Sequence, residues 1–265
     1  MKYFKFATII FLIFILIPTL AQARPEPFVK VISVSGSAEY LASGKTDWEE
    51  LKVDMLLRSG DSVKTGKDSS VNIAFDGERE NVVNIRSSTH VVLVLGEREK
   101  IELVDGEVFA LIKRLPSGSS FEIRTPTAVC GARGTGWGAL VDRLKTIISS
   151  YENASYAKGI KKDGTLTDET IILEGYKAIV KIYGEISKLM KIADKDYEQW
   201  NTWKDALIEL LSRARAIMER LAKDLDKIQD QKEKIEERRD EDRIRKREEA
   251  TGAGTGPTDR LKDSY

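Results

Sequence analysis

The chain is poor in the residues that build most redox and metal centres. It has one cysteine, Cys130, and one histidine, His90, among its 265 residues. A single cysteine excludes an internal disulfide, and one cysteine with one histidine excludes the usual zinc and haem ligand sets. We therefore expect no cofactor, and the stability of the fold must come from a buried apolar core.

The chain also has no excess of positive or negative charge. Lysine and arginine together number 43, and so do aspartate and glutamate, which gives a formal net charge of zero. Proteins that bind nucleic acid or anionic lipid usually carry a basic excess. The composition therefore points away from nucleic acid as a partner.

Long apolar runs occur only at the N-terminus. Two lysines precede an apolar run over residues 6–20, and Ala21 and Ala23 supply the small residues that signal peptidase recognises. This pattern is typical of a secretory signal peptide, residues 1–23, cleaved after Ala23. We expect an exported protein, periplasmic or secreted, whose mature chain has no transmembrane segment, because no second run is long enough to span a bilayer.

Residues 28–184 have the pattern of a β domain. The stretch VNIAF, which begins at Val71, places an apolar side chain at every second position, as in a half-buried strand. Turn signals recur at short intervals, among them Asp105-Gly106, where glycine accepts positive φ without a Cβ clash. Many short strands at this spacing predict an antiparallel β-sandwich or roll.

Residues 185–249 have a helical pattern and are expected to form an arm. Apolar residues step by three and four in a heptad-like seam, formed by Leu207, Leu210, Ala214, Ile217 and Leu221. The following steps, to Leu225 and Ile228, place two fours in a row, a stutter that locally unwinds a supercoil. The pattern predicts a long, partly coiled-coil-like helix.

The two ends of this arm differ in character. Trp200 and Trp203 lie on one side of the helix, and we expect them to fix its root to the sheet. Residues 230–249 are almost all charged, with both signs mixed, which predicts a solvated helical end. Residues 250–265 have no pattern and are expected to be a disordered tail.

Three motifs of the β zone occur in a characteristic order. Residues 57–66 read Leu-x-x-Gly-Asp-x-Val-x-Thr-Gly, residues 103–108 read Leu-x-x-Gly-x-Val, and residues 125–135 read Thr-Pro-x-Ala-x-x-x-x-Arg-Gly-Thr. Through these motifs the chain resembles the FecR domain, the periplasmic module of bacterial iron-uptake regulators. The resemblance implies an all-β fold whose turns depend on a set of structural residues. These are Gly60, Asp61, Thr65, Gly66, Gly134 and Gly175.

The densest stretch, residues 125–142, admits three interpretations. Its glycines fit the dinucleotide fingerprint G-x-G-x-x-G/A, but the β-branched residues that follow do not favour the required helix. Cys130 beside Arg133 suggests a reactive thiol, although free cysteine is among the most buried residue types. We favour the third interpretation, β architecture, with Arg133, Thr135 and Trp137 as a candidate docking surface.

Two functions remain open at this stage. The first is an exported, non-enzymatic cell-envelope module whose β domain binds a protein or glycan, while the charged helix provides oligomerisation or reach. The second is a sensor or regulatory subunit that modulates a separate membrane regulator or a TonB-dependent iron transporter. Well-known FecR proteins signal through a membrane helix to a cytoplasmic part, which we do not expect in this chain. We expect no enzyme, because one histidine and no Gly-x-Ser-x-Gly leave no evident nucleophile and base. The expected partner is an envelope protein, or a second copy bound through the helix.

Overall fold

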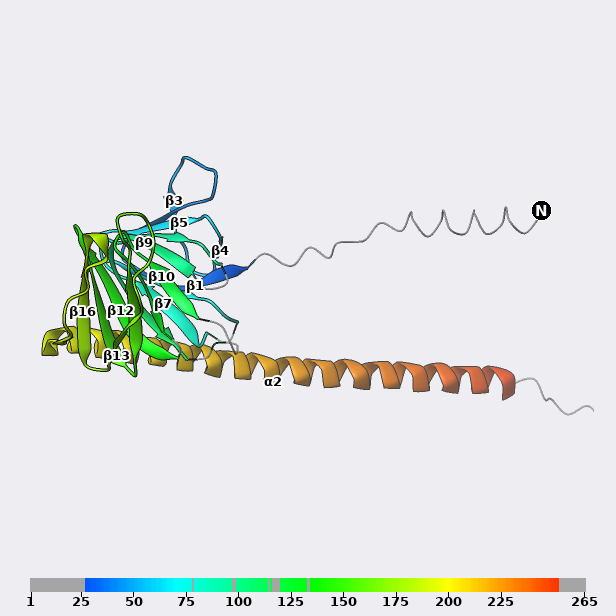
Figure 1. Ribbon diagram of the computed structural model, residues 1–265. Coiled ribbons are helices and arrows are strands. Elements are labelled where there is room, and N and C mark those ends of the chain that lie inside the picture. The colour runs from blue at the N-terminus through cyan, green and yellow to red at the C-terminus, as the bar shows by residue number, and fades with distance from the viewer. Residues whose placement is uncertain are drawn as a thin grey trace, which may run out of the picture. The chain divides into compact units, whose positions relative to one another are not determined.

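The computed structural model describes residues 27–77, 79–96, 99–113, 115, 120–132 and 134–252. These form two units, a β unit that extends to Tyr197 and a helical unit that begins at Glu198 (Figure 1). The predicted signal peptide lies outside the described residues. So does the predicted tail, except for residues 250–252, which continue the helix.

Short strands joined by tight turns build the β unit. They are β1 (Phe28–Ser35), β2 (Ala38–Leu41), β3 (Glu49–Glu50), β4 (Leu56–Arg58), β5 (Ser62–Thr65), β6 (Ser70–Ala74), β7 (Asn81–Ile85), β8 (His90–Leu93), β9 (Glu99–Ile112), β10 (Phe121–Arg124), β11 (Ala128–Ala132), β12 (Thr135–Asp142), β13 (Lys145–Glu152), β14 (Ser155–Gly159), β15 (Thr170–Ile172), β16 (Tyr176–Lys181) and β17 (Met190–Lys191).

The strands pair into two sheets that share β9. The first sheet has the order β4-β1-β6-β7-β9-β12-β13-β16-β17. The second has the order β3-β2-β5-β8-β9-β10-β11-β14-β15. Neighbours in the described part are antiparallel, except that β10 runs parallel to β9. The predicted mainly β fold with a C-terminal helix is confirmed.

The expected hairpin turn at Asp105-Gly106 is wrong. These residues lie inside β9, whose first half pairs with β8 and whose second half pairs with β7 and β12. Gly106 has a φ of 90°, and a Cβ there would lie 2.6 Å from the Cα of Thr89. The glycine therefore lets one strand bend from the second sheet into the first. The chain leaves β9 in the first sheet and returns to the second, so β10 runs parallel to it.

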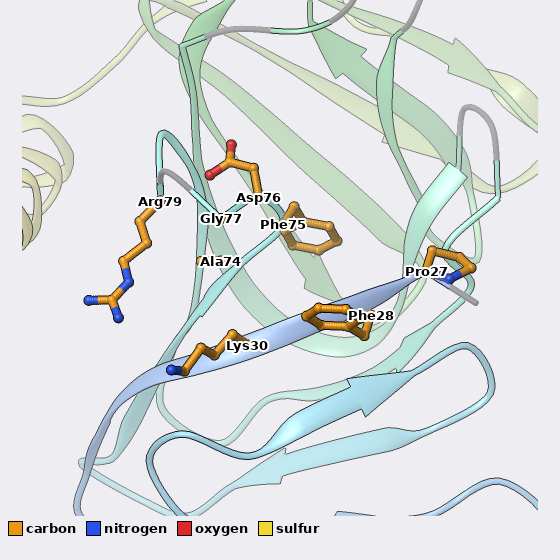
Figure 2. A pocket seen from close by; sticks show the side chains of 8 residues that line it. All are labelled: Pro27, Phe28, Lys30, Ala74, Phe75, Asp76, Gly77 and Arg79. Atoms are coloured by element: carbon orange, nitrogen blue, oxygen red, sulfur yellow. The ribbon is translucent and has the colours of Figure 1, made fainter. Parts of the chain in front are cut away.

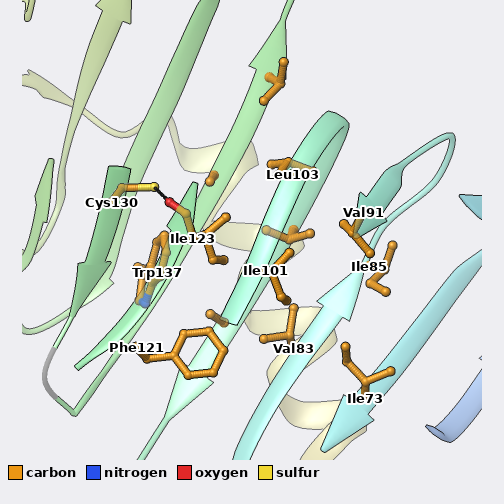
Figure 3. Close-up of a cluster of buried hydrophobic side chains, with 14 of the residues drawn as sticks. Ile73, Val83, Ile85, Val91, Ile101, Leu103, Phe121, Ile123, Cys130 and Trp137 are labelled. Atoms are coloured by element: carbon orange, nitrogen blue, oxygen red, sulfur yellow. Dashed lines mark hydrogen bonds between the residues drawn. The ribbon is translucent and has the colours of Figure 1, made fainter. Parts of the chain in front are cut away.

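One apolar core lies between the sheets. Ile73 and Ile85 of the first sheet and Val91 and Ile123 of the second are fully buried in the same cluster. Figure 3 shows their side chains pointing toward one another. Each such side chain contributes about 1.5–3 kcal/mol on burial, which is what a chain without disulfides requires.

The β unit extends further than the predicted boundary at residue 184. A single 3₁₀ turn, η1 (Ile182–Gly184), reverses the chain after β16, and Tyr183 takes a φ of 65° there. Ser187 N then donates to Ile179 O over 2.9 Å, and β17 pairs with β16. Residues 185–193 therefore return along β16, through an isolated bridge between Ile186 and Val180 and the short strand β17, and they do not belong to the predicted helical arm.

The helix α2 (Asp194–Gly252) begins on the β unit. The Lys177 ammonium lies 3.0 Å from an Asp196 carboxylate oxygen, and the Tyr151 and Tyr197 rings meet edge to face with centroids 5.5 Å apart. The acidic residues of the first turn, Asp194 and Asp196, also suit the positive end of the helix dipole. These contacts fix where the helix starts.

Farther along α2, the Trp200 and Trp203 rings contact each other with centroids 5.0 Å apart, and both side chains are buried. Their predicted attachment to the sheet stays a prediction. Within the described ranges, no helix has the length and apolarity that crossing a bilayer requires.

Candidate functional site

The Thr-Pro-x-Ala motif forms the turn between β10 and β11, where buried hydroxyls tie the two sheets together. Thr146 Oγ1, on β13, lies 2.7 Å from Thr125 Oγ1 and 2.8 Å from Thr127 Oγ1. Thr127 Oγ1 donates to Val180 O on β16, and Ala128 N donates to Thr125 Oγ1. The sequence analysis did not predict a role for Thr146, because its only signal is that it is a polar residue within an apolar run.

The candidate docking surface needs correction at two of its three residues. Trp137 is fully buried, Thr135 is 3% exposed, and both belong to β12, in the middle of the first sheet. Neither side chain reaches a partner from there. Arg133 lies outside the described residues. The sequence suggested a surface because tryptophan and threonine suit docking sites as well as cores.

The same placement excludes the dinucleotide fingerprint. Residues 134–139 lead into and form β12, which is antiparallel to β9 and β13. The fingerprint needs a helix to open at the glycines, within a parallel βαβ unit. Here Gly138 allows close packing instead, because a Cβ there would lie 2.9 Å from the Phe109 ring.

Cys130 is a core residue. It is fully buried on β11, and its Sγ lies 3.5 Å from Ile123 O (Figure 3). Burial, and then the charge of Glu122, raise the pKa of the Cys130 thiol far above its usual range. A buried thiol that stays protonated is a poor nucleophile, so the reactive-cysteine interpretation fails.

The Gly-Asp motif organises the turn between β4 and β5. The Asp61 carboxylate accepts hydrogen bonds from Ser43 N over 2.9 Å and from Arg58 N over 2.8 Å. Gly60 N donates to Leu93 O, which attaches this turn to β8. With both carboxylate oxygens bound to backbone, Asp61 holds the turn in place.

Thr65 and Gly66 act similarly after β5. Thr89 N donates to Thr65 Oγ1 over 3.0 Å, and Gly66 N donates to Ser37 O over 2.9 Å. Two more of the predicted structural glycines lie at turns with positive φ, 75° at Gly134 and 82° at Gly175.

A buried carboxylate that sequence reasoning missed lies on β10. Glu122 is 7% exposed and accepts a 2.6 Å hydrogen bond from the Tyr156 hydroxyl. Burial, and then that hydrogen bond, raise the pKa of Tyr156, so the phenol remains a donor. The described part of the chain contains no group of three or more histidine, cysteine or acidic side chains placed to hold a metal ion.

An open hollow of about 470 Å³ lies at the start of β1. Figure 2 shows the Phe28 and Phe75 rings lying close together, with the ends of Lys30 and Arg79 on one side of them. Phe28 is 54% exposed, which is unusual for an aromatic ring in a strand.

The charged groups of this hollow already have partners within the fold to different degrees. Asp76 accepts from Glu80 N and Asn81 N over 2.8 and 2.9 Å, so both of its oxygens are occupied. The Lys30 ammonium lies 2.7 Å from an Asp54 oxygen at the surface. The hollow therefore has an aromatic floor, and its rim carries the cations Lys30 and Arg79 beside the carboxylate of Asp76.

A second hollow of about 300 Å³ lies beside the first and shares Phe28 and Phe75 with it. Leu95, Lys100 and Phe121 line its far side, and the Phe75 and Phe121 rings meet edge to face at 4.8 Å. The two hollows form one groove, which we call the Phe28 groove. No sequence signal marked it, because its residues come from four separate segments.

Comparisons with known proteins agree with the motifs. The family described as FecR protein matches residues 61–154. No curated protein matches the chain. Two crystal structures of a candidate anti-sigma factor from Parabacteroides distasonis ATCC 8503, at 2.50 and 1.65 Å resolution, are similar to it, each with 16% identity and a TM-score of 0.41.

Those matches cover 52% of this chain, which spans 63% of the length of each of the two structures. The matched family segment runs from Asp61, within the Gly-Asp motif, to Ala154, after β13. It contains the Thr-Pro-x-Ala turn, the bent β9 and the buried Cys130. The match over residues 61–154 confirms the resemblance to the FecR family that the sequence motifs predicted.

Proposed function

We propose that this chain is a regulatory module of the cell envelope, which senses or modulates another protein by binding it through the β unit. The observation that carries the proposal is the FecR match over residues 61–154. This is the sensor role that the sequence analysis left as the second possibility. Export of the chain is part of the proposal.

The chemistry of the described residues supports binding over catalysis. The buried polar groups that resemble catalytic residues are each engaged in the fold. Glu122 holds the Tyr156 hydroxyl, Asp61 holds backbone amides, and Cys130 is protonated in the core. Catalytic acids and nucleophiles need access to substrate, which none of these has.

The Phe28 groove is the recognition surface in this proposal. An exposed aromatic ring beside cations suits a peptide segment that carries apolar side chains and carboxylates, because arginine and aromatic residues anchor many protein interfaces. The backbone N–H of Arg79 donates to Asp76 O over 3.3 Å, whereas its guanidinium has no hydrogen bond or ion pair with the residues that the structure describes. Its guanidinium can therefore meet a carboxylate without breaking a contact in the fold.

The test is capture from native envelope extract with the full-length mature chain and two groove variants, Phe28→Ser and Arg79→Glu. Both side chains are at the surface, so the β fold should survive, which circular dichroism checks. We expect each variant to weaken capture of the same protein at least tenfold, equivalent to about 1.4 kcal/mol.

Matched controls are Leu144→Ser and Lys162→Glu. Leu144 is 67% exposed at the turn between β12 and β13, and Lys162 is exposed in the turn after β14. Capture should be unchanged in both. Equal capture by all four variants would show that the Phe28 groove is not the recognition surface. The absence of any captured protein would contradict the binding role.

A further inference from the structure

The helix α2 presents a row of apolar side chains to solvent. Met218 is 67% exposed, Leu221 53%, Leu225 65%, Ile228 50% and Ile235 49%. The rest of this exposed helix is mainly charged, apart from Ile208, Ile217 and Ile244, which lie outside the row. A continuous apolar row of this length is typical of a surface that another element covers.

The spacing of this row is more regular than the sequence analysis suggested. Taking Leu211 and Met218 in place of Leu210 and Ile217 removes the predicted stutter. The steps then alternate strictly between four and three residues. The resulting seam is Leu207, Leu211, Ala214, Met218, Leu221, Leu225, Ile228, Lys232 and Ile235.

This seam spans four heptads, the length at which an a/d repeat indicates a coiled coil. In that register Leu211, Met218 and Leu225 occupy a positions, and Leu221 and Ile228 occupy d positions. The first position, Leu207, is already buried, whereas the positions from Met218 onward are open, apart from the polar Lys232.

Ion pairs within the helix lie off this seam. Arg213 pairs with Glu209, and Lys227 pairs with Asp224 over 3.2 Å, four and three residues apart. Their side chains occupy outer or flanking positions of the heptad. The charges therefore solvate the outer face and leave the seam available for apolar packing.

We propose that the seam from Leu211 to Ile235 pairs with the same seam of a second copy of this chain. A narrow a/d row packs best against another helix that has the same four-three repeat. Each side chain of one row then inserts into a hole between side chains of the other row. Another copy supplies that repeat over the whole length. This inference does not depend on the Phe28 groove.

The two seam positions that lack a large apolar side chain, Ala214 and Lys232, favour antiparallel pairing. With the copies centred on residue 223, Leu221 faces Leu225, Met218 faces Ile228 and Leu211 faces Ile235. Ala214 then faces Lys232, whose aliphatic stem covers the small residue while its ammonium reaches water. In parallel register each of these would meet its own copy, leaving a gap at Ala214 and two ammonium groups together at Lys232.

The first experiment measures the molar mass of the full mature chain by sedimentation equilibrium, with Ile228→Asp and the matched variant Ile244→Asp. Both isoleucines are on α2 and are exposed to a similar degree, 50% and 57%, but Ile244 lies off the seam. We expect a dimer at about 50 μM for the wild type and for Ile244→Asp. Ile228→Asp should weaken the dimer at least tenfold. A monomeric wild type, or a dimer unaffected by Ile228→Asp, would overturn the proposal.

The second experiment tests direction by disulfide formation between chains. Chains with Leu211→Cys should cross-link to chains with Ile235→Cys, whereas Ile235→Cys alone should not cross-link to itself. The native Cys130 does not compete, because it is fully buried. Self-cross-linking of Ile235→Cys, without the mixed product, would overturn the antiparallel arrangement.

Discussion

At Gly131 the β unit has no room for a side chain. A Cβ there would lie 2.4 Å from Phe121 O and 2.9 Å from the Tyr156 hydroxyl. The nearer atom belongs to the backbone of the paired strand β10 and cannot rotate away. The close approach of β10 to β11 therefore requires a glycine at position 131.

We therefore expect Gly131→Ala to destabilise the chain by about 1–3 kcal/mol, the usual cost of overpacking. Urea unfolding measures this, with Gly77→Ala as the control, because no atom lies within 4 Å of a Cβ at Gly77. Equal stability of the two variants would contradict the close approach of the strands.

The Thr146 hydroxyl supports a second prediction at this scale. Replacing it with a methyl group in Thr146→Val keeps the volume but leaves Thr125 and Thr127 without their shared partner. Both threonines keep their hydrogen bonds to Ala128 and Val180, so the variant loses only the two bonds to Thr146. Each lost bond is worth about 0.5–1.5 kcal/mol, so the free energy of unfolding should fall by about 1–3 kcal/mol. Thr146→Ser, which keeps the hydroxyl, should lose less. The opposite order would show that packing of the methyl group, and not the hydrogen bonds, matters.

His90 should make stability depend on pH. Burial, and then the nearby Lys64 ammonium, lower the pKa of His90 below 6.5, although Asp105 and Glu102 act in the opposite direction. Its ring also packs edge to face against Trp48, with centroids 5.9 Å apart. The folded chain therefore favours the neutral imidazole.

The unfolded chain binds the proton more readily, so stability is complete above about pH 6.5 and declines as the pH falls toward the folded pKa. Denaturant midpoints at pH 7.5 and pH 5.5 measure this decline, which His90→Gln should reduce. An equal decline in the variant would assign the effect to carboxylates.

At the scale of elements, the charged end of α2 should be dispensable for the β unit. Residues 229–250 are exposed along their whole length, and the β unit ends at Tyr197. Deleting residues 229–265 should therefore shift the melting temperature of the β unit by less than about 2 °C. Thermal scans followed by near-ultraviolet circular dichroism test this. A large drop would mean that the deleted segment stabilises the β unit directly.

The strands were predictable where one face is buried, because period-two alternation directly reflects that burial, as at Val71 and Ile73. Asp105-Gly106 was misassigned as a hairpin because the same dipeptide serves a bend within one strand. The close approach of Thr89 that requires this bend is a contact between distant segments, which local patterns do not contain.

The helix shows the same limit in another form. Its existence was predictable from the three-four spacing. It begins at Asp194 and not at residue 185, because the short strand β17 comes before it. The Phe28 groove was not predictable, since Phe28, Phe75 and Leu95 come together only in the folded chain. Family motifs identified the turns, whereas the proposed recognition surface lies elsewhere.

At the scale of the whole molecule, the family segment does not contain the complete β unit. Its strand β6 pairs with β1, and its strand β13 pairs with β16, both outside residues 61–154. The Phe28 groove also includes β1. The proposed recognition surface therefore includes residues beyond the family motifs, and a protein that shares only those motifs need not share this surface.

Export is the property on which an envelope function depends. Residues 1–23 have the charged start, apolar run and small residues of a signal peptide, and Ala21 and Ala23 occupy the recognition positions. We expect the full gene product, expressed in a bacterium with a periplasm, to yield a soluble protein whose intact mass begins at Arg24. Ala23→Arg should block cleavage, because signal peptidase requires a small residue there, and should leave the chain attached to the inner membrane. A wild-type product that retains Met1 would contradict cleavage, and its recovery in the cytoplasm would contradict the envelope role as well.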